Sequence, residues 1–277
     1  CEHFFDGYAA DRDYGVEVLR TAFAAGAEVG VMCDTNGGML PMGVGRVVAD
    51  VRSRVGGRLG IHCQDDTGCA VANTLAAVEA GVTHVQGTAN GYGERAGNAD
   101  TFALIANLVT KMGLPVVPEG CLTELQRVSH AIAELANIAP DEHQPYVGAS
   151  AFAHKAGLHA SAIKVSPELY NHLDPEVVGN DMRILVTEMA GRASVELKGR
   201  ELGVDLDGHA DVIGRVVDRV KVLEADGWSF EAADASFELL LRAELPDAPP
   251  PLFELESYRT TVEHAGNGQV MSEATVK

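Results

Sequence analysis

Two side chains at the end of an apolar segment, His62 and Gln64, have types and a spacing suited to holding a divalent cation. They lie in "LGIHCQDDTGCAVAN", where an apolar run changes abruptly to polar residues. Residues two apart on a strand point to the same face, so both side chains would point together into a site at the strand end. The alternative is a histidine that is simply hydrogen-bonded there. The acidic pair that follows, Asp65 and Asp66, favours a site.

A glycine-rich segment, "NGYGERAGN" at residues 90–98, directly follows another apolar run. Its glycines allow the backbone to turn tightly. Asn98 can supply an oxygen ligand, and Glu94 and Arg95 can pair beneath the turn. The alternative is an ordinary loop between a strand and a helix, which suffices for a single G-x-G. The full string is more specific than that.

Three further side chains could contact a substrate. Asp34 and Thr35, in "CDTNGG", either cap the following helix or hydrogen-bond a substrate carboxylate. Glu2, in "CEHFFDGY", is either a carboxylate that points inward or an unpaired polar residue at the rim. The residues alone leave these alternatives open.

A last polar motif, "SAFAHKAGLHASAI", carries His154, Lys155 and His159 around a glycine. A solvated helical face is the simpler interpretation of His154 alone. The grouping of two histidines and a lysine is the reason to keep the motif as a candidate.

The elements that would position these residues repeat one scheme. "DYGVEVLRTAFAAGAEVGVMCDT" and "CAVANTLAAVEAGVTHVQGT" each contain an amphipathic helix, a glycine stop and an apolar strand. The expected strand ends, Asp34, His62 and Gly87, are about 25 to 28 positions apart, as consecutive β/α units with short loops require. Such alternation predicts a parallel α/β sheet with its site at the carboxyl ends of the strands.

A (β/α)8 TIM barrel is the architecture that this pattern favours. A dinucleotide-binding sheet would need G-x-G-x-x-G between a strand and a helix, and "GYGERAG" has the wrong spacing. We expect residues 1–120 to form the C-terminal half of the barrel and the missing strands to lie upstream. The chain would then be an internal piece of a longer polypeptide.

The sequence changes character after this region. Residues 122–138 predict a helix, and residues 121–244 as a whole predict small helical subdomains. "LPDAPPP" at 245–251 has the composition of a linker. From residue 252 to residue 277 the pattern predicts a hairpin around "GNG", the start of another domain.

Composition excludes several classes of function. A net charge of −19 leaves no broad basic surface for nucleic acid or an anionic membrane. No segment approaches the ~18 consecutive apolar residues of a membrane span. The five cysteines are scattered without a CxxC pair, as is typical of reduced thiols, so we expect a cytoplasmic protein.

Taken together, the motifs resemble a known family. "CDTNGG", "GIHCQDDTGCAVAN", "QGTANGYGERAGN", "SAFAHKAGLHASA" and "LESYRTTVEHAGNGQVMSEATVK" are similar to segments of the 2-isopropylmalate synthase and homocitrate synthase family. "EHFFDGY" and "FEAADASFELLLR" look most like its citramalate synthase branch. The resemblance covers essentially the whole chain.

The resemblance implies a metal-dependent acyltransferase with a TIM barrel, a helical region and the start of an α+β regulatory domain. In the citramalate branch the enzyme condenses acetyl-CoA with pyruvate, gives (R)-citramalate and CoA, and serves isoleucine biosynthesis. A homodimer is implied as well. The near alternative is a 2-isopropylmalate or homocitrate synthase that acts on another 2-oxo acid. A non-catalytic relative of the barrel is the more distant alternative.

The resemblance also assigns roles to residues. It implies metal binding by His62 and Asn98, together with an Asp on a strand that we expect upstream. Glu2, His159 and Tyr170 would be catalytic. The base that removes a proton from acetyl-CoA stays unassigned among them.

Two positions complete this implied site. Thr35 would contact the substrate. Gln64 stands where the family pattern has its second metal-binding His; its neutral carbonyl oxygen suits Mg²⁺ better than Zn²⁺ or Mn²⁺. A weakened metal site, a change of metal or a lost site are the open outcomes. Without the upstream half we expect the 277 residues alone to be inactive.

Overall fold

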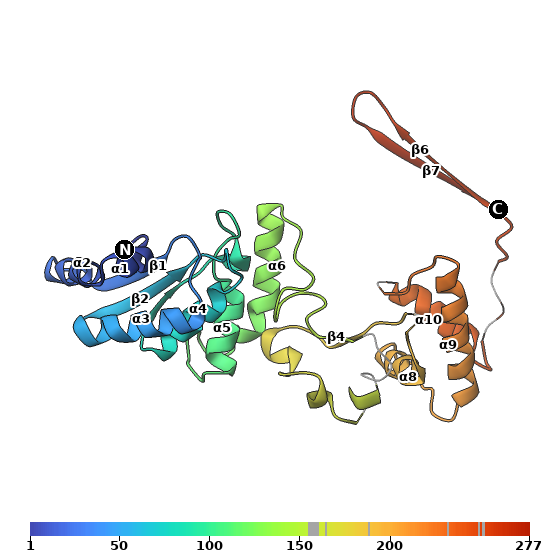
Figure 1. Cartoon of the computed structure of the whole chain (residues 1–277). Coiled ribbons are helices and arrows are strands. Elements are labelled where there is room, and N and C mark those ends of the chain that lie inside the picture. Colours follow the sequence, from blue (N-terminus) through green and yellow to red (C-terminus); the bar gives the residue numbers. More distant parts are fainter. Residues whose placement is uncertain (155–160, 164, 188, 232, 249, 251–252) are drawn as a thin grey trace. The chain divides into compact units, whose positions relative to one another are not determined.

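The computed structural model describes residues 1–154, 161–163, 165–187, 189–231, 233–248, 250 and 253–277. The described residues up to Ile184 form one compact unit, and those from Leu185 onward form a second. Figure 1 shows the order of the elements along the chain. The candidate strand-end residues all belong to the first unit.

The first unit is built on three parallel strands that pair in the order β1-β2-β3. The strands are β1 (Val29–Asp34), β2 (Arg58–Cys63) and β3 (His84–Gln86). Five helices precede, connect or follow them: α1 (Phe4–Ala10), α2 (Arg12–Ala24), α3 (Pro41–Arg54), α4 (Ala70–Glu79) and α5 (Thr101–Thr110). The predicted β/α alternation is thus confirmed, with the strand ends within one residue of the positions expected.

Local signals explain where these helices begin. Asp11 accepts a hydrogen bond from the Tyr14 N–H at the start of α2, and Asp100 accepts from the first amides of α5. Both satisfy backbone donors that a helix leaves free at its first turn. Pro41 occupies the first position of α3, where its missing N–H costs nothing.

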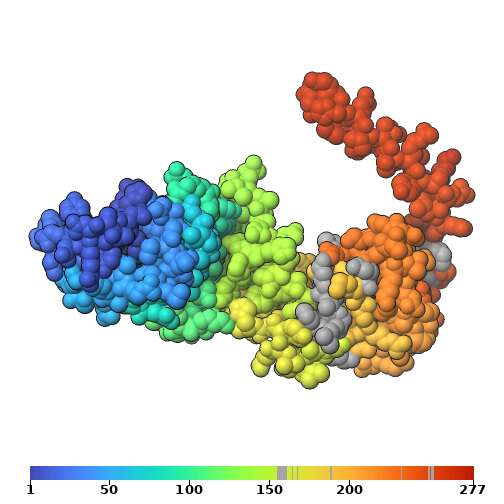
Figure 2. Space-filling view, viewed as in Figure 1, coloured from blue at the N-terminus to red at the C-terminus, as the bar shows by residue number. Residues whose placement is uncertain are grey.

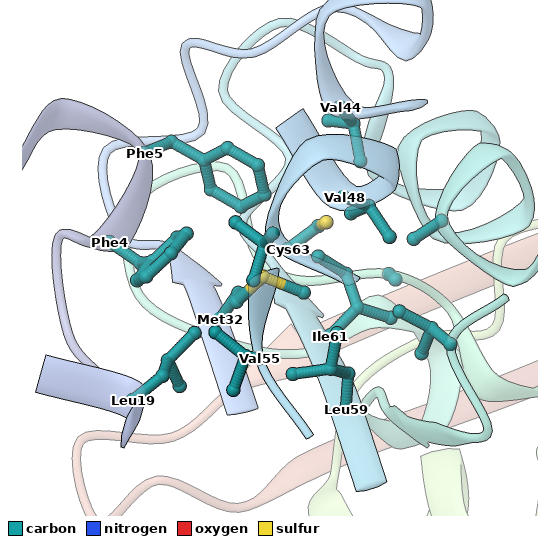
Figure 3. Close-up of a cluster of buried hydrophobic side chains, with 14 of the residues drawn as sticks. Phe4, Phe5, Leu19, Met32, Val44, Val48, Val55, Leu59, Ile61 and Cys63 are labelled. Carbon is teal, nitrogen blue, oxygen red and sulfur yellow. The ribbon is translucent and has the colours of Figure 1, made fainter. Parts of the chain in front are cut away.

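One face of the sheet packs against the helices. Met32 of β1 and Leu59, Ile61 and Cys63 of β2 are buried in a cluster with side chains of α1, α2 and α3 (Figure 3). Alternation along a strand then directs the remaining residues to the opposite face. His62 therefore points away from the helices, as predicted, while Cys63 points toward them.

The amino-terminal residues extend the same sheet. The Cys1 nitrogen donates to the Val31 carbonyl at 2.7 Å, and the Cys33 N–H donates to the Cys1 carbonyl at 3.1 Å. This is the bonding pattern of a parallel neighbour. Glu2 consequently stands at the carboxyl end of a strand position beside β1.

The rest of the first unit packs on α5. It contains η2 (Cys121–Glu124), α6 (Leu125–Ala136), β4 (Ala153–His154), η3 (Pro167–Leu169), η4 (Pro175–Val178) and β5 (Arg183–Ile184). Phe102 and Ala106 of α5 share a buried cluster with Leu125, Tyr146 and Phe152. The helix predicted at 122–138 is confirmed, although its first turn is a 3-10 turn.

The second unit contains a helical core and a hairpin. The helices are α8 (Arg192–Glu201), α9 (Ala210–Ala225) and α10 (Asp234–Ala243), with Val216, Phe237 and Leu241 among their buried contacts. The predicted hairpin is confirmed as β6 (Tyr258–His264) and β7 (Val270–Val276), which pair antiparallel. None of the described helices has the length and apolarity to cross a membrane.

A buried lysine links two helices of the second unit. Lys198 in α8 is 2% exposed, and its Nζ lies 2.9 Å from Glu201 and 2.9 Å from Asp234, the first residue of α10. Both carboxylates are partly exposed. The lysine stem therefore fills core space, while its charged end reaches hydrated partners.

Substitutions at Lys198 separate the stability that its stem contributes from the stability that its charge contributes. Lys198→Met keeps the stem volume and removes the buried charge, so we expect the stability to change by less than about 1 kcal/mol. Lys198→Ala leaves a cavity and should cost about 2 kcal/mol or more. Thermal unfolding of the full-length protein measures both, with exposed Lys221→Met as the control. A larger loss in the Met variant than in the Ala variant would contradict this division.

Candidate active site

Three loops meet at the carboxyl ends of the strands. They follow β1, β2 and β3, and backbone hydrogen bonds join them. The Gln64 N–H donates to the Asp34 carbonyl at 3.2 Å, and the Asp65 N–H donates to the Gly97 carbonyl at 2.9 Å. Gln64 and Asn98 also form an isolated antiparallel bridge. The residues predicted from two separate motifs are therefore neighbours.

The predicted metal ligands have the surroundings of a binding site. His62 is half-buried and Asn98 is buried. The Gln64 Oε1 atom is buried and has no hydrogen-bond partner among the described residues. An unpaired buried carbonyl oxygen is costly unless something else satisfies it.

This donor set fits a divalent cation. Amide carbonyl oxygens are accepted ligands of Mg²⁺ and Mn²⁺, and an imidazole nitrogen is a common ligand of transition metals. The unpaired Gln64 Oε1 atom is the observation that supports the fit. Among the described residues there is no group of three or more His, Cys, Asp or Glu side chains arranged around one metal position. The amide oxygens of Gln64 and Asn98 are thus essential to any site formed here.

A glycine makes room for Asn98. A Cβ atom on Gly93 would overlap the side-chain nitrogen of Asn98 and would also contact Gly97. The Asn98 N–H donates to the Gly91 carbonyl at 3.0 Å, which closes the loop on itself. The spacing of glycines in "NGYGERAGN" therefore determines where Asn98 stands.

Both members of the acidic pair after β2 make structural contacts. Asp65 accepts a hydrogen bond from the Ala70 N–H at 2.7 Å at the start of α4. Asp66 pairs with Arg95. Structural contacts therefore account for one Asp65 oxygen and both Asp66 oxygens, and the interpretation of this pair as a sign of a site stays a prediction.

Arg95 contacts two loops besides its own. Its Nε and Nη2 atoms donate to the two Asp66 carboxylate oxygens at 2.7 and 3.0 Å, and Nη2 also donates to the Thr35 carbonyl at 2.7 Å. Sequence reasoning had expected Arg95 to pair with Glu94. The hydrogen bond from Arg95 holds the pKa of Asp66 below its ordinary value.

The loop after β1 is held from several sides. Asp34 accepts from the Met39 N–H at 3.2 Å, Thr67 donates to the Gly37 carbonyl at 2.9 Å, and the Asn73 side chain donates to the Met39 carbonyl at 2.9 Å. Asp34 thus holds the turn before α3 without capping the helix, because the cap position is Leu40 and no side chain bonds there; the predicted capping role is wrong. Burial raises the pKa of its carboxyl group.

Thr35 and Glu2 lie at the same edge of the sheet. The Thr35 hydroxyl accepts from the His3 N–H at 2.7 Å and can donate its own proton elsewhere. Glu2 is exposed, and its carboxylate lies close to Cys33. Burial, with a further contribution from Glu2, raises the pKa of the Cys33 thiol. Both candidates are therefore near the strand end where His62 stands.

The remaining predicted catalytic residues are placed differently. His159 and Lys155 lie outside the described residues. Tyr170 follows η3, and its ring lies 6.3 Å from that of His154, centroid to centroid. His154 Nε2 is 2.9 Å from Asn171 Oδ1. In the described part of the chain, no hydrogen bond or ring contact joins Tyr170 to the three predicted metal ligands.

Sequence reasoning missed two polar residues on β3. His84 and Gln86 share the face of His62, and Gln86 lies directly beside His62 in the parallel ladder. Their side-chain nitrogens, His84 Nε2 and Gln86 Nε2, are 3.3 Å apart. The available signal was the repeated His-x-Gln spacing, which occurs in "HCQ" and again in "HVQ".

Comparison with known families and proteins gives consistent matches. The family model described as HMGL-like matches residues 4–132, and the model described as homocitrate synthase post-HMGL domain-like matches residues 146–227. The (R)-citramalate synthase of Streptomyces coelicolor is 64% identical over 277 residues, which cover 100% of this chain and 52% of that protein.

Two more distant relatives extend the comparison. The (R)-citramalate synthase of Geobacter sulfurreducens is 43% identical over 277 residues, covering 100% of this chain and 52% of that protein. The chain therefore spans about half the length of the curated relatives it matches. A solved HMG-CoA lyase from Acinetobacter baumannii is 24% identical, with a TM-score of 0.41 over 47% of this chain and 45% of that chain.

Gly93→Ala tests the position of Asn98. The added methyl group must displace the Asn98 side chain, so we expect Mn²⁺ binding by the full-length protein to weaken about tenfold or more. Titration calorimetry measures this. Gly45→Ala, in α3, is the matched control because the nearest atom to its added Cβ is 4.0 Å away. Equal Mn²⁺ affinity in both variants would remove Asn98 from the ligand set.

Asp34→Asn tests the cost of a buried carboxylate. The raised pKa means that the fold favours protonated Asp34, so its ionisation lowers stability as the pH rises above the ordinary carboxyl value. We expect the Asn variant to be more stable than the native protein near pH 7, with the difference vanishing near pH 4. Thermal unfolding at both pH values measures it.

Asp66→Asn should change the stability near pH 7 in the opposite direction to Asp34→Asn, in the same experiment. The pKa of Asp66 is lowered, so its charge contributes stability above the ordinary carboxyl value, and that contribution is lost as the pH falls. The Asn variant should therefore be slightly less stable near pH 7, by a small margin because solvent screens this partly exposed pair. Shifts of the same sign in both variants would contradict the assignment.

Proposed function

Because the chain belongs to the family of the 2-isopropylmalate and homocitrate synthases, which includes its citramalate synthase relatives, we propose that the full-length protein is a citramalate synthase. It condenses acetyl-CoA with pyruvate to give (R)-citramalate and free CoA, in the synthesis of isoleucine. The observation that carries the proposal is the match of citramalate synthases over 100% of this chain, including all three strand-end loops.

Family membership confirms the predicted fold class. The HMGL-like match runs from α1 into α6 and includes the parallel sheet, which is the fold of a (β/α)8 barrel. The described residues contribute β1, β2 and β3, and Cys1 bonds to β1 as a further strand would. The polar residues at the strand ends therefore face the position that barrels use for their active sites.

His62, Gln64 and Asn98 are the residues that would hold a divalent metal. When bound, such a metal supplies Lewis acid polarisation of the 2-oxo acid carbonyl. The orphaned Gln64 Oε1 supports this set. Its neutral amide oxygen is a hard ligand, which favours Mg²⁺.

Other side chains of the chain bind substrate and move protons. The Thr35 hydroxyl, fixed by the His3 N–H, is oriented to donate to a substrate carboxylate. Glu2 places a carboxylate beside the same strand end, where it can accept or hold a proton. His159 and Tyr170 are proposed, from the family resemblance, to act on the acetyl-CoA proton.

The wider assignments belong to the same proposal. The full-length protein would be a cytoplasmic homodimer that binds acetyl-CoA and a 2-oxo acid, with no nucleic acid or membrane partner. Residues 1–120 would be barrel, residues 121–244 helical subdomains that complete the active site, and residues 245–251 a linker. Residues 252–277 would begin the regulatory domain.

The substrate is tested by thiol release. Full-length protein with acetyl-CoA and Mg²⁺ or Mn²⁺ is offered pyruvate, 2-oxoisovalerate or 2-oxoglutarate separately. We expect release of CoA with pyruvate only. Release with 2-oxoisovalerate or 2-oxoglutarate would instead indicate a 2-isopropylmalate or homocitrate synthase. Silence with all three would favour the non-catalytic relative.

The role of Gln64 as a metal ligand is tested by measuring the Mn²⁺ affinity of its variants. Gln64→Leu removes the amide oxygen at similar volume, so Mn²⁺ binding should weaken about tenfold or more. Gln64→His supplies an imidazole, and we expect it to bind Mn²⁺ at least as tightly as the native protein. Titration calorimetry compares the variants. Unchanged affinity in Gln64→Leu would show that this residue is no ligand.

A further inference from the structure

We propose that Arg95 is a positioning residue whose guanidinium holds the three strand-end loops together and so determines where Thr35 and Asn98 stand. For its catalytic consequence this inference rests on the proposed condensation. The structural claim is independent of it, because it concerns only contacts among the described residues.

One planar group contacts all three loops, in addition to the backbone hydrogen bonds between them. Arg95 belongs to the loop after β3, and it donates twice to Asp66 in the loop after β2 and once to the Thr35 carbonyl in the loop after β1. A guanidinium can direct several N–H groups at once in a fixed plane. A lysine ammonium at this position cannot reproduce the paired bonds to Asp66.

Backbone hydrogen bonds within the loop that carries Arg95 link the position of Asn98 to that of Arg95. The Gly97 N–H donates to the Glu94 carbonyl, and the Asn98 N–H donates to the Gly91 carbonyl, both at 3.0 Å. The backbone of Arg95 has a φ of +58°, a left-handed conformation that is unfavourable for residues other than glycine. The contacts of its surroundings must therefore stabilise it. Release of the guanidinium would allow this short loop, and Asn98 with it, to relax.

The contact with Asp66 also depends on a close approach between two loops. A Cβ atom on Gly37 would overlap the Asp66 carboxylate. Gly37 has a φ of +65°, so glycine is required there for the backbone as well. Asp66 is thereby presented to Arg95 directly against the loop that carries Thr35.

The ion pair between Arg95 and Asp66 is partly exposed, so its loss should have little effect on global stability. The Arg95 and Asp66 side chains are 41% and 27% exposed, so solvent screens their attraction and they add little to global stability. The expected effect is therefore on the geometry of the loops and only weakly on unfolding.

Arg58 is a matched control. It is the first residue of β2, at the opposite edge of the sheet, and donates to the Thr83 hydroxyl at 3.3 Å and the Thr83 carbonyl at 3.0 Å. Arg58 thus also links two segments through a guanidinium and a backbone carbonyl. It does so away from Thr35 and Asn98.

The experiment compares Arg95→Gln, Arg95→Lys and Arg58→Gln in the full-length protein. We expect both Arg95 variants to raise the KM for pyruvate, by about tenfold to a hundredfold, since small misplacements of binding groups cost that much. The KM for acetyl-CoA and the Tm should change no more than in Arg58→Gln. Hydrogen exchange of the amides of residues 35–40 should become faster in the Arg95 variants alone.

The outcomes separate the two proposals. If the native protein releases no CoA with any 2-oxo acid, the proposed function fails, and hydrogen exchange alone then decides the role of Arg95. Unchanged exchange in residues 35–40, or equal changes in Arg95→Gln and Arg58→Gln, would overturn the inference. If Arg95→Gln does not fold, Arg95→Lys gives the test, because it keeps the positive charge and loses the fixed, planar set of bonds to Asp66 and Thr35.

Discussion

The parallel pairing of β1, β2 and β3 is the constraint on which the rest of the first unit depends. The ladder aligns Cys33 with His62 and His62 with Gln86, so polar residues far apart in the sequence form one row. Because all three strands run in the same direction, their loops must emerge at one edge. Burial of Met32 and Ile61 against the helices directs this row to the other face (Figure 3).

Much of this arrangement could be predicted from the sequence. The alternation of amphipathic helices and apolar strands predicted the parallel sheet, and the i, i+2 spacing correctly separated His62 from Cys63. Both signals depend on local periodicity, which a sequence displays directly.

The roles of charged residues could not be predicted from spacing. Asp65 caps a helix and Asp66 binds Arg95, although both stand beside a candidate ligand (Gln64) in the sequence. An arginine can reach an acid in another loop as easily as its neighbour, and only the fold decides which partner is near. For the same reason, spacing alone did not predict that the ring of Tyr170 lies beside that of His154.

The strand-end loops belong to the amino-terminal part of the chain, which is coloured blue to green in the space-filling view (Figure 2). The loop after β1 is held in place by side chains from several elements: Asp34, Thr67, Asn73 and Arg95. The proposed substrate contact is a different residue, Thr35. Scaffold and selectivity therefore depend on different side chains. A lineage could exchange the residue that meets the substrate in single mutational steps while the loop keeps its shape. Under the proposed function, a change of 2-oxo acid would then cost little folding stability.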